Sequence, residues 1–173
     1  LILDEDGVYD PTNFNDRLDD IFQKENNRTL AGSLSGYAEV NEKGIILVDN
    51  STAGKDGIEI VDARTFKSLA SIPSSELENP RAVVKATDTK AYITCWDATG
   101  DFSNFYKNPG YVAILDLTTN KLTKKILVQN GAESILVIGN EAFVGNTGSG
   151  VTKITVIDIA TDAVKQSIEV GQN

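Results

Sequence analysis

A phrase of fifteen residues that occurs three times constrains the fold of this 173-residue chain more than any other feature. Each copy begins as an apolar strand, has an aspartate at its fifth position, passes through a short turn and ends on isoleucine. The aspartates Asp62, Asp116 and Asp158 lie 54 and then 42 residues apart. Spacings of roughly 40 to 50 residues indicate an array of similar units rather than one irregular domain. The copies are IEIVDARTFKSLASI (58–72), VAILDLTTNKLTKKI (112–126) and ITVIDIATDAVKQSI (154–168).

Each unit contains four short apolar stretches separated by turn residues, which predicts four antiparallel strands. Several middle strands are almost continuously apolar, as expected of strands covered on both faces. Stacked blades provide that cover, so the sequence predicts an all-β fold, a β-propeller of four-stranded antiparallel blades. The expected strands are 36–40, 45–48, 58–62 and 67–72 in the first unit, 81–86, 90–96, 110–116 and 124–128 in the second, and 133–138, 141–146, 153–158 and 163–170 in the third.

The chain is interpreted as a single partial propeller domain over residues 1–173. In this interpretation a lead-in over residues 1–32 precedes blades at 33–80, 81–132 and 133–173. Three blades do not close a ring, because propellers typically use about four to eight. An open stack would also leave sheet edges that invite pairing with other chains. We therefore expect the missing blades to come from the rest of a longer chain or from another chain.

The lead-in carries the pattern of a short helix. Its apolar residues Phe14, Leu18, Ile21 and Phe22 recur with helical period, and polar residues fill the positions between them. The pattern predicts a helix over about residues 15–24 that packs its apolar stripe on the edge of the sheet.

The composition argues against several classes of partner. A net charge of −9 leaves the chain without the basic surface that nucleic acid or an anionic membrane would require. No apolar run approaches the ~18 residues of a membrane-spanning helix, so no transmembrane segment is predicted. The one cysteine, Cys95, lies in the apolar run AYITCW and is expected to be a small buried hydrophobe that forms no intrachain disulfide.

Common catalytic and metal-binding patterns are missing from this sequence. It contains no histidine and one cysteine, which excludes typical zinc sites and Ser-His-Asp or Cys-His centres in this segment. The acidic stretches at 4–7 and 97–101 lack the spacing of a calcium loop, and the glycine-rich stretch at 145–150 lacks the Lys-Ser/Thr of a phosphate-binding loop. No metal, cofactor or catalytic residue is predicted.

The repeated aspartates Asp62, Asp116 and Asp158 are predicted to have a structural role. Each ends a strand just before a turn, where a carboxylate can accept backbone N–H groups and fix the turn. Recurrence in every unit indicates architecture rather than one active site.

The loop at residues 96–111 is the strongest candidate for binding. It is longer than the equivalent loops and rich in aromatic residues, which provide rigid contact area for a partner, although the rings could instead fold back onto the neighbouring blade. Antiparallel strand order places this loop on the same face as the connections between blades, where polar side chains could converge around an aromatic platform. The candidate ligand-binding residues are Trp96, Asp97, Phe105, Tyr106, Arg81, Asn130, Asn146 and Asp49, with Asn50, Phe102, Tyr111 and Glu133 nearby on the same face.

The chain resembles the YVTN-type seven-bladed β-propellers. AYIT (91–94) and AFVGN (142–146) are similar to the strand that names the family. ILDLTTNK (114–121) and VIDIATDA (156–163) are similar to its V-x-V-I-D strand and following turn, and IEVGQN (168–173) to its closing element. Within the family the chain most resembles surface-layer-like lipoproteins of anaerobic Gram-negative bacteria. DDIFQKENNRTL (19–30) is similar to their lead-in, although Ala31 and Gly32 depart from the expected Leu-Gly-Asp.

This resemblance implies a non-enzymatic, exported propeller in the periplasm or at the cell surface as an outer-membrane lipoprotein. Some members capture cobalamin and pass it to a TonB-dependent transporter. The function predicted from the sequence is therefore binding of a ligand or partner, possible ligands being a corrinoid or a glycan. One alternative is a structural module that docks on an outer-membrane transporter. A second is a metal-dependent, lactonase-like propeller enzyme whose ligands lie in the missing blades.

Overall fold

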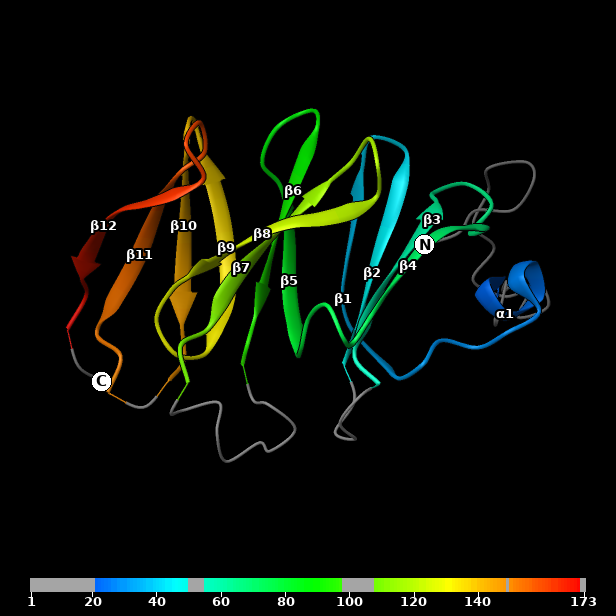
Figure 1. Cartoon of the computed structure of the whole chain (residues 1–173), viewed down its shortest axis with the longest axis horizontal. Helices are drawn as coiled ribbons and strands as arrows, with labels where there is room; N and C mark the ends of the chain where they lie inside the picture. Colours follow the sequence, from blue (N-terminus) through cyan, green and yellow to red (C-terminus); the bar gives the residue numbers. More distant parts are fainter. Residues whose placement is uncertain (1–20, 50–54, 98–107, 149, 172–173) are drawn as a thin grey trace, which may run out of the picture.

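A computed structural model of the chain describes residues 21–49, 55–97, 108–148 and 150–171. Within these residues lie one short helix and three sheets of four antiparallel strands each (Figure 1). The predicted all-β fold of four-stranded blades is confirmed, and we name the sheets the first, second and third blade. The elements are α1 (Ile21–Asn26); β1 (Ser33–Val40), β2 (Lys43–Asp49), β3 (Gly57–Asp62) and β4 (Ser68–Pro73); β5 (Pro80–Lys85), β6 (Lys90–Cys95), β7 (Tyr111–Asp116) and β8 (Lys121–Leu127); β9 (Ala132–Ile138), β10 (Glu141–Asn146), β11 (Lys153–Asp158) and β12 (Ala163–Glu169).

Two strands begin three residues earlier than the sequence predicted. β1 begins at Ser33, which pairs with Asp49, and β8 begins at Lys121, which pairs with Asp116. Each added segment, 33–35 and 121–123, has a single leucine between two polar residues. The apolar signal is therefore weak there, and pairing with the neighbouring strand defines the start of the strand.

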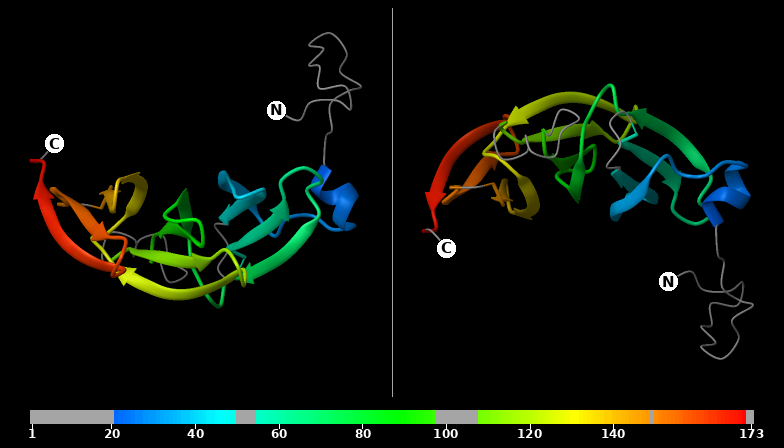
Figure 2. Two further views of the ribbon diagram at one scale, coloured as in Figure 1. Left: turned by 90° about the horizontal axis from the view of Figure 1, so that it is seen from above. Right: turned by 90° about the horizontal axis from the view of Figure 1, so that it is seen from below.

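The three blades are arranged along an arc (Figure 2). β1, β5 and β9 line its concave side, and β4, β8 and β12 its convex side. The innermost strands contact one another, β1 with β5 and β5 with β9. The described blades therefore form a segment of a propeller, with the loops that join blades at one end of the strands.

Two apolar clusters fill the spaces between blades. Ile60 and Ile93 are fully buried between the first and second blades, and Tyr92 and Val144 between the second and third. Consecutive strand residues such as Tyr92 and Ile93 point to opposite faces, so a strand between two clusters must be apolar at every position. Each such side chain contributes about 1.5 to 3 kcal/mol by burial, which explains the continuous apolar runs of β2, β3, β6 and β7.

Helix α1 ends later than predicted. The part of the predicted helix at residues 15–20 lies outside the described residues, while the described helix continues past residue 24 to Asn26. Asn27 follows it with a φ of 52°, a left-handed conformation that asparagine adopts readily and that commonly ends a helix. The buried Phe22 packs on Ile46, Val48 and Val61, so the helix covers a face of the first blade rather than only its edge.

The repeated aspartates fix the turns between the third and fourth strands. Asp62 Oδ1 accepts hydrogen bonds from the backbone N–H groups of Arg64 (3.0 Å) and Thr65 (2.9 Å). Asp116 and Asp158 accept backbone hydrogen bonds in the same way, each from the threonine three residues later, at 2.9 Å. These N–H groups are the main reason that the pKa of each aspartate is lowered, because they stabilise the charged form.

The turn aspartates should therefore stabilise the fold in a pH-dependent manner. A carboxylate whose pKa is lowered on folding contributes above its unfolded pKa of about 3.9, and the contribution is lost as pH falls through the folded pKa. Chemical denaturation from pH 6 to pH 2 should show that the triple variant D62N/D116N/D158N differs most from wild type at pH 6 and least at pH 2. A constant difference across this range would contradict the role of the ionised carboxylates.

A lysine at the start of the second strand links each of the first two blades to the next one. Lys43 Nζ donates to the carbonyl oxygen of Leu117 and to Asn120 Oδ1 (2.7 Å) in the second blade. Lys90 Nζ donates in the same way to the third blade, to the carbonyl oxygen of Ile159 and to Asp162 Oδ1, both at 2.6 Å. The third blade has Glu141 at the corresponding position, since Glu141 pairs with Asp158 as Lys90 pairs with Asp116.

One face of the third blade is open within the described residues. When the strand registers of the two blades are aligned, the residues of this face correspond to the second-blade residues that pack on the third blade. Leu136 and Ile138, for example, are 58% and 59% exposed, whereas their equivalents Val84 and Ala86 pack against the cluster between blades. This face therefore has the pattern of a face that packs on a further blade. Its residues are Leu136, Ile138, Phe143, Ile154, Val156, Ile168 and Val170.

Candidate functional site

Arg81 is the centre of a polar cluster that joins all three blades. Its Nη1 lies 2.8 Å from Asp49 Oδ2 in the first blade. Its Nε and Nη2 each lie 3.2 Å from an oxygen of Glu133 in the third blade, a two-point contact that suits the planar guanidinium. The guanidinium also lies over the indole ring of Trp96, 4.3 Å from the ring centroid. Charge pairing and stacking together hold the guanidinium in one plane.

A β-bulge at the same place in each innermost strand positions these residues. The register shifts in β1, β5 and β9 leave one extra residue in each strand: Ser35, Arg81 and Glu133. The extra residue of a bulge is re-aimed relative to its neighbours, and here Ser35 and Arg81 both reach the next blade. Ser35 Oγ donates to the carbonyl oxygen of Pro80 (2.7 Å), as Arg81 donates to Glu133.

Asn79 is a member of this cluster that the sequence reasoning missed. It is buried, and its Nδ2 donates to Asp49 Oδ1 (3.2 Å) while its backbone N–H donates to Asp56 Oδ2 (3.1 Å). Its carbonyl oxygen accepts from the backbone N–H of Trp96 (3.1 Å), and its φ of 46° is left-handed. The Asn-Pro dipeptide that it forms with Pro80 is a turn signal that could have drawn attention to this position.

The structure brings together some of the predicted site residues. Asp49, Arg81 and Trp96 meet in the cluster, and Asp97 follows Trp96, its carbonyl oxygen accepting from Asn108 Nδ2 (3.0 Å). The predicted residues Phe105 and Tyr106, together with Asn50 and Phe102, lie outside the described residues.

The other two predicted residues lie in the third blade and its connections. The carbonyl oxygen of Asn130 accepts from the N–H of Gly148 (3.1 Å). Asn146 ends β10, and its Nδ2 donates to the carbonyl oxygens of Val144 (3.2 Å) and Lys153 (3.4 Å). Asn146 and Lys153 line a hollow of about 720 Å³ at the end of the third blade, so Asn146 contributes to a separate surface.

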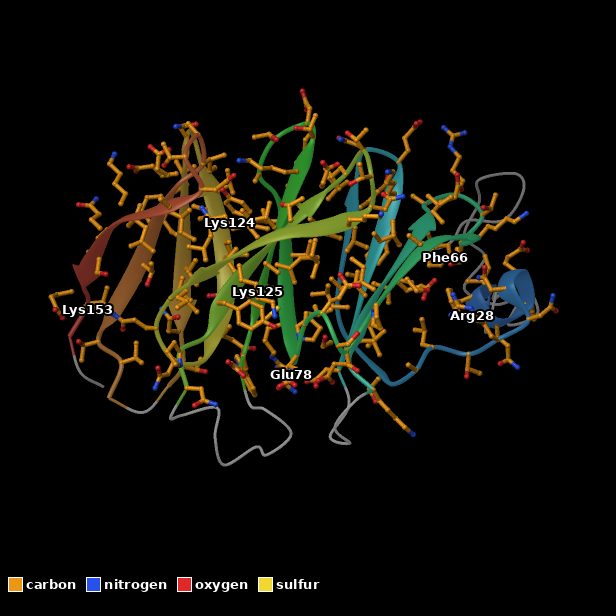
Figure 3. The ribbon with its side chains drawn as sticks, in the orientation of Figure 1. Arg28, Phe66, Glu78, Lys124, Lys125 and Lys153 are labelled. Carbon is orange, nitrogen blue, oxygen red and sulfur yellow. The ribbon has the colours of Figure 1, made fainter. Side chains whose placement is uncertain are left out.

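Tyr111 belongs to the core rather than to an exposed aromatic platform. It is 4% exposed, its hydroxyl oxygen accepts from the N–H of Glu78 (2.8 Å), and Lys125 Nζ lies 4.5 Å from its ring centroid. Glu78 and Lys125 are labelled in Figure 3. Burial raises its pKa above the ordinary tyrosine value. The alternative that loop aromatics fold back onto the blades is therefore correct for Tyr111. Cys95 is fully buried as predicted, and burial raises the pKa of its thiol to about 12.

Carboxylates outnumber cations around Arg81. Among the described residues, Asp49, Asp56 and Glu133 lie in the cluster or in direct contact with it, against the positive charge of Arg81. Within the ranges that the structure describes, no three acidic or cysteine side chains are arranged to hold a metal ion. The same ranges contain no helix of the length and apolar character needed to cross a membrane. The arrangement suits hydrogen bonding and stacking more than electrostatic capture of an anion.

Comparison with solved structures identifies the architecture. The chain superposes on hydrazine synthase of Kuenenia stuttgartiensis with a TM-score of 0.63 and 13% identity over 82% of this chain and 39% of that one. It superposes on the WD40 β-propeller domain of Doa1 with a TM-score of 0.55 and 12% identity, covering 79% of this chain and 40% of that chain. The fold is that of a β-propeller.

A further propeller match is the dihydro-heme d1 dehydrogenase NirN, solved in complex with DHE. Its TM-score is 0.60 at 16% identity, over 83% of this chain and 29% of that one. The chain thus spans less than half the length of each of these three propeller chains, in agreement with an incomplete ring. Identities this low establish the fold alone. No protein-family model and no curated protein matches the sequence.

Proposed function

We propose that the chain is part of a non-enzymatic, exported propeller, at the cell surface or in the periplasm, that binds a ligand next to Arg81 and Trp96. The observation that carries this proposal is the stacked guanidinium and indole, held between carboxylates at the end of the blades where the interblade connections lie. Contacts from all three blades fix the guanidinium before any ligand arrives, and such pre-organisation lowers the entropy cost of binding.

The chemistry around Arg81 favours a neutral ligand rich in hydroxyl or amide groups. Glu133 retains a side chain 35% exposed, so its oxygens can accept further hydrogen bonds from a ligand. The excess of carboxylates disfavours an anion, while Trp96 offers an aromatic surface for flat or ring-shaped groups. A corrinoid with its amide side chains, or a glycan, has this chemistry. The predicted loop residues Phe105 and Tyr106 would extend the same surface.

Replacing Trp96 with alanine should weaken binding by about 30-fold, the loss expected when a central aromatic contact is removed. Calorimetric titration of wild type and W96A against cyanocobalamin and a panel of neutral oligosaccharides measures this change. Tyr37→Ala is the control, because Tyr37 is an exposed aromatic residue that stacks on Phe66 in the first blade. Equal affinity of W96A and wild type would remove the Trp96 face from the site, and turnover of a lactone by the protein would contradict the non-enzymatic role.

The open face of the third blade favours a second candidate, a structural module that docks on a partner such as an outer-membrane transporter. Leu136 and Ile138 are exposed apolar residues on this face, and Glu141 stands where the first two blades carry an interblade lysine. Contiguous exposed apolar surface of this kind marks interaction sites. Co-purification of a transporter that persists in W96A but is lost in Leu136→Asp would favour docking over ligand capture.

A further inference from the structure

Within the described residues, the first blade also has a face that no other blade covers, and the lead-in occupies it. Phe22 of α1 is buried against Ile46, Val48 and Val61, and Leu30 and Phe66 pack around this cluster. Figures 1 and 2 show α1 at the end of the arc, beyond the first blade. The two ends of the described array therefore differ, because one is covered by the lead-in and the other is open.

Strand register shows that the lead-in takes the place of a preceding blade. Ile46 is equivalent to Ile93 in the second blade and to Val144 in the third, since the three residues hold the same position in the second strand. Ile93 packs against the first blade and Val144 against the second. On the first blade the equivalent contact is made by Phe22 instead.

The covered face also contains a buried carboxylate, Glu59, whose cation comes from the lead-in. Glu59 is 5% exposed and occupies the position that Ala113 and Thr155 hold in the other blades. Arg28 Nη2 lies 2.6 Å from Glu59 Oε1, and Arg28 lies over the ring of Phe22. Figure 3 labels Arg28 beside the first blade. An apolar blade packed here would leave a buried carboxylate without its cation, which is strongly unfavourable.

The turn between β3 and β4 of the first blade also differs from its counterparts, and the difference again favours contact with the lead-in. In the second and third blades this turn presents Asn120 and Asp162, which accept from Lys43 and Lys90 of the preceding blade. The first blade has Phe66 there, whose side chain offers no acceptor. Instead Asn26 of the lead-in donates through Nδ2 to the carbonyl oxygen of Phe66 (2.9 Å) and accepts through Oδ1 from the N–H of Ser68 (2.7 Å).

We propose that residues 21–30 form an end cap, a dedicated replacement for a preceding blade, and that the first blade accepts no other blade while the cap is seated. Three independent features carry this inference: the apolar contact of Phe22, the ion pair of Arg28 with Glu59, and the two hydrogen bonds of Asn26. The array is therefore directional, with its capped end at the first blade and its accepting end at the third.

The apolar contact is tested by Phe22→Asp, with the exposed neighbour Gln23→Asp as the matched control of equal added charge. Hydrogen exchange should become on the order of tenfold faster or more in β2 and β3 of Phe22→Asp, because their cover is lost, and remain unchanged in the third blade. Gln23→Asp should exchange like wild type. Identical exchange in the two variants would overturn the proposal, as would uniform acceleration in all three blades. The same comparison of Phe22→Asp with Gln23→Asp can be made in a longer protein that contains this chain. Faster exchange in β2 and β3 of Phe22→Asp would show that the cap covers the first blade there, and equal exchange would show that a blade covers it instead.

The ion pair is tested by comparing a single and a double variant, neither of which requires α1 to detach from the first blade. Among the described residues, Arg28→Gln leaves Glu59 with the hydroxyls of Ser68 and Ser71 as partners, so exchange in β3 should accelerate. Arg28→Gln/Glu59→Gln removes both charges and should restore much of the protection. If the double variant exchanges faster than Arg28→Gln, Glu59 is not held by the cap and the proposal fails.

Discussion

Replacing Arg81 with methionine is expected to lower the free energy of unfolding by roughly 2 to 3 kcal/mol. Removing one partner of a fully buried ion pair costs about 3 to 5 kcal/mol. The side chains of Arg81, Asp49 and Glu133 are 24%, 16% and 35% exposed, so water screens part of the lost interaction. The cost remains substantial because one guanidinium serves carboxylates from two blades and the Trp96 ring. Urea denaturation monitored by Trp96 fluorescence and by circular dichroism measures it.

The matched control is Lys85→Met, which removes an exposed cation from the same strand. Lys85 pairs with Asp88 at 2.6 Å, but their side chains are 43% and 91% exposed, and exposed pairs contribute about 0 to 1 kcal/mol. Arg81→Lys refines the comparison, because lysine keeps the charge and loses the planar two-point contact. A cost for Arg81→Met no greater than that for Lys85→Met would show that the cluster does not join the blades energetically.

The strands and turns could be predicted from the sequence because local signals determine them. Asp62, Asp116 and Asp158 act on N–H groups within three residues of themselves, so recurrence in the sequence is enough to identify their role. The fully buried strands were equally visible, since packing on both faces requires continuous apolar runs.

The cluster around Arg81 was only partly predictable, because its geometry depends on register across blades. Asp49, Arg81 and Trp96 were predicted together because antiparallel strand order places them at the same end of the strands. The bulge that aims Arg81 at Glu133 is a property of the pairing between β5 and β6, which depends on both strands. Asn79 was missed because the turn signal of its Asn-Pro dipeptide does not indicate that the residue is buried between two blades.

The cap was hidden for a related reason. The helical stripe containing Phe22 identified an amphipathic helix, but not which surface of the sheet it covers. Glu59 lies inside an apolar strand, where its sequence context gives no indication that its cation is Arg28. Glu59 is the one charged residue at the second position of the three repeated phrases, but only the structure shows that this position faces the lead-in.

The last residue of the repeated phrase provides a matched contrast between equivalent positions. Ile126 pairs with Val112, and Ile168 pairs with Ile154, so the two isoleucines occupy the same place in successive blades. Ile126 is 5% exposed between the second and third blades, whereas Ile168 is 39% exposed on the open face. Ile126→Ala should cost about 2 to 4 kcal/mol, the range for a buried large-to-small substitution. Ile168→Ala should cost less than about 1 kcal/mol.

The two variants control for each other, because each makes the same substitution at the same position of a fourth strand. Local strand propensity therefore cancels, and the difference in denaturation midpoint at constant slope reports the packing of one blade on the next. Equal costs in this chain would mean that the open face is already covered, by a second copy or by residues outside the described ranges. In a longer protein whose next blade packs on the third, Ile168→Ala should lower the free energy of unfolding as much as Ile126→Ala does. Removing the isoleucine side-chain atoms would then leave a cavity between two blades.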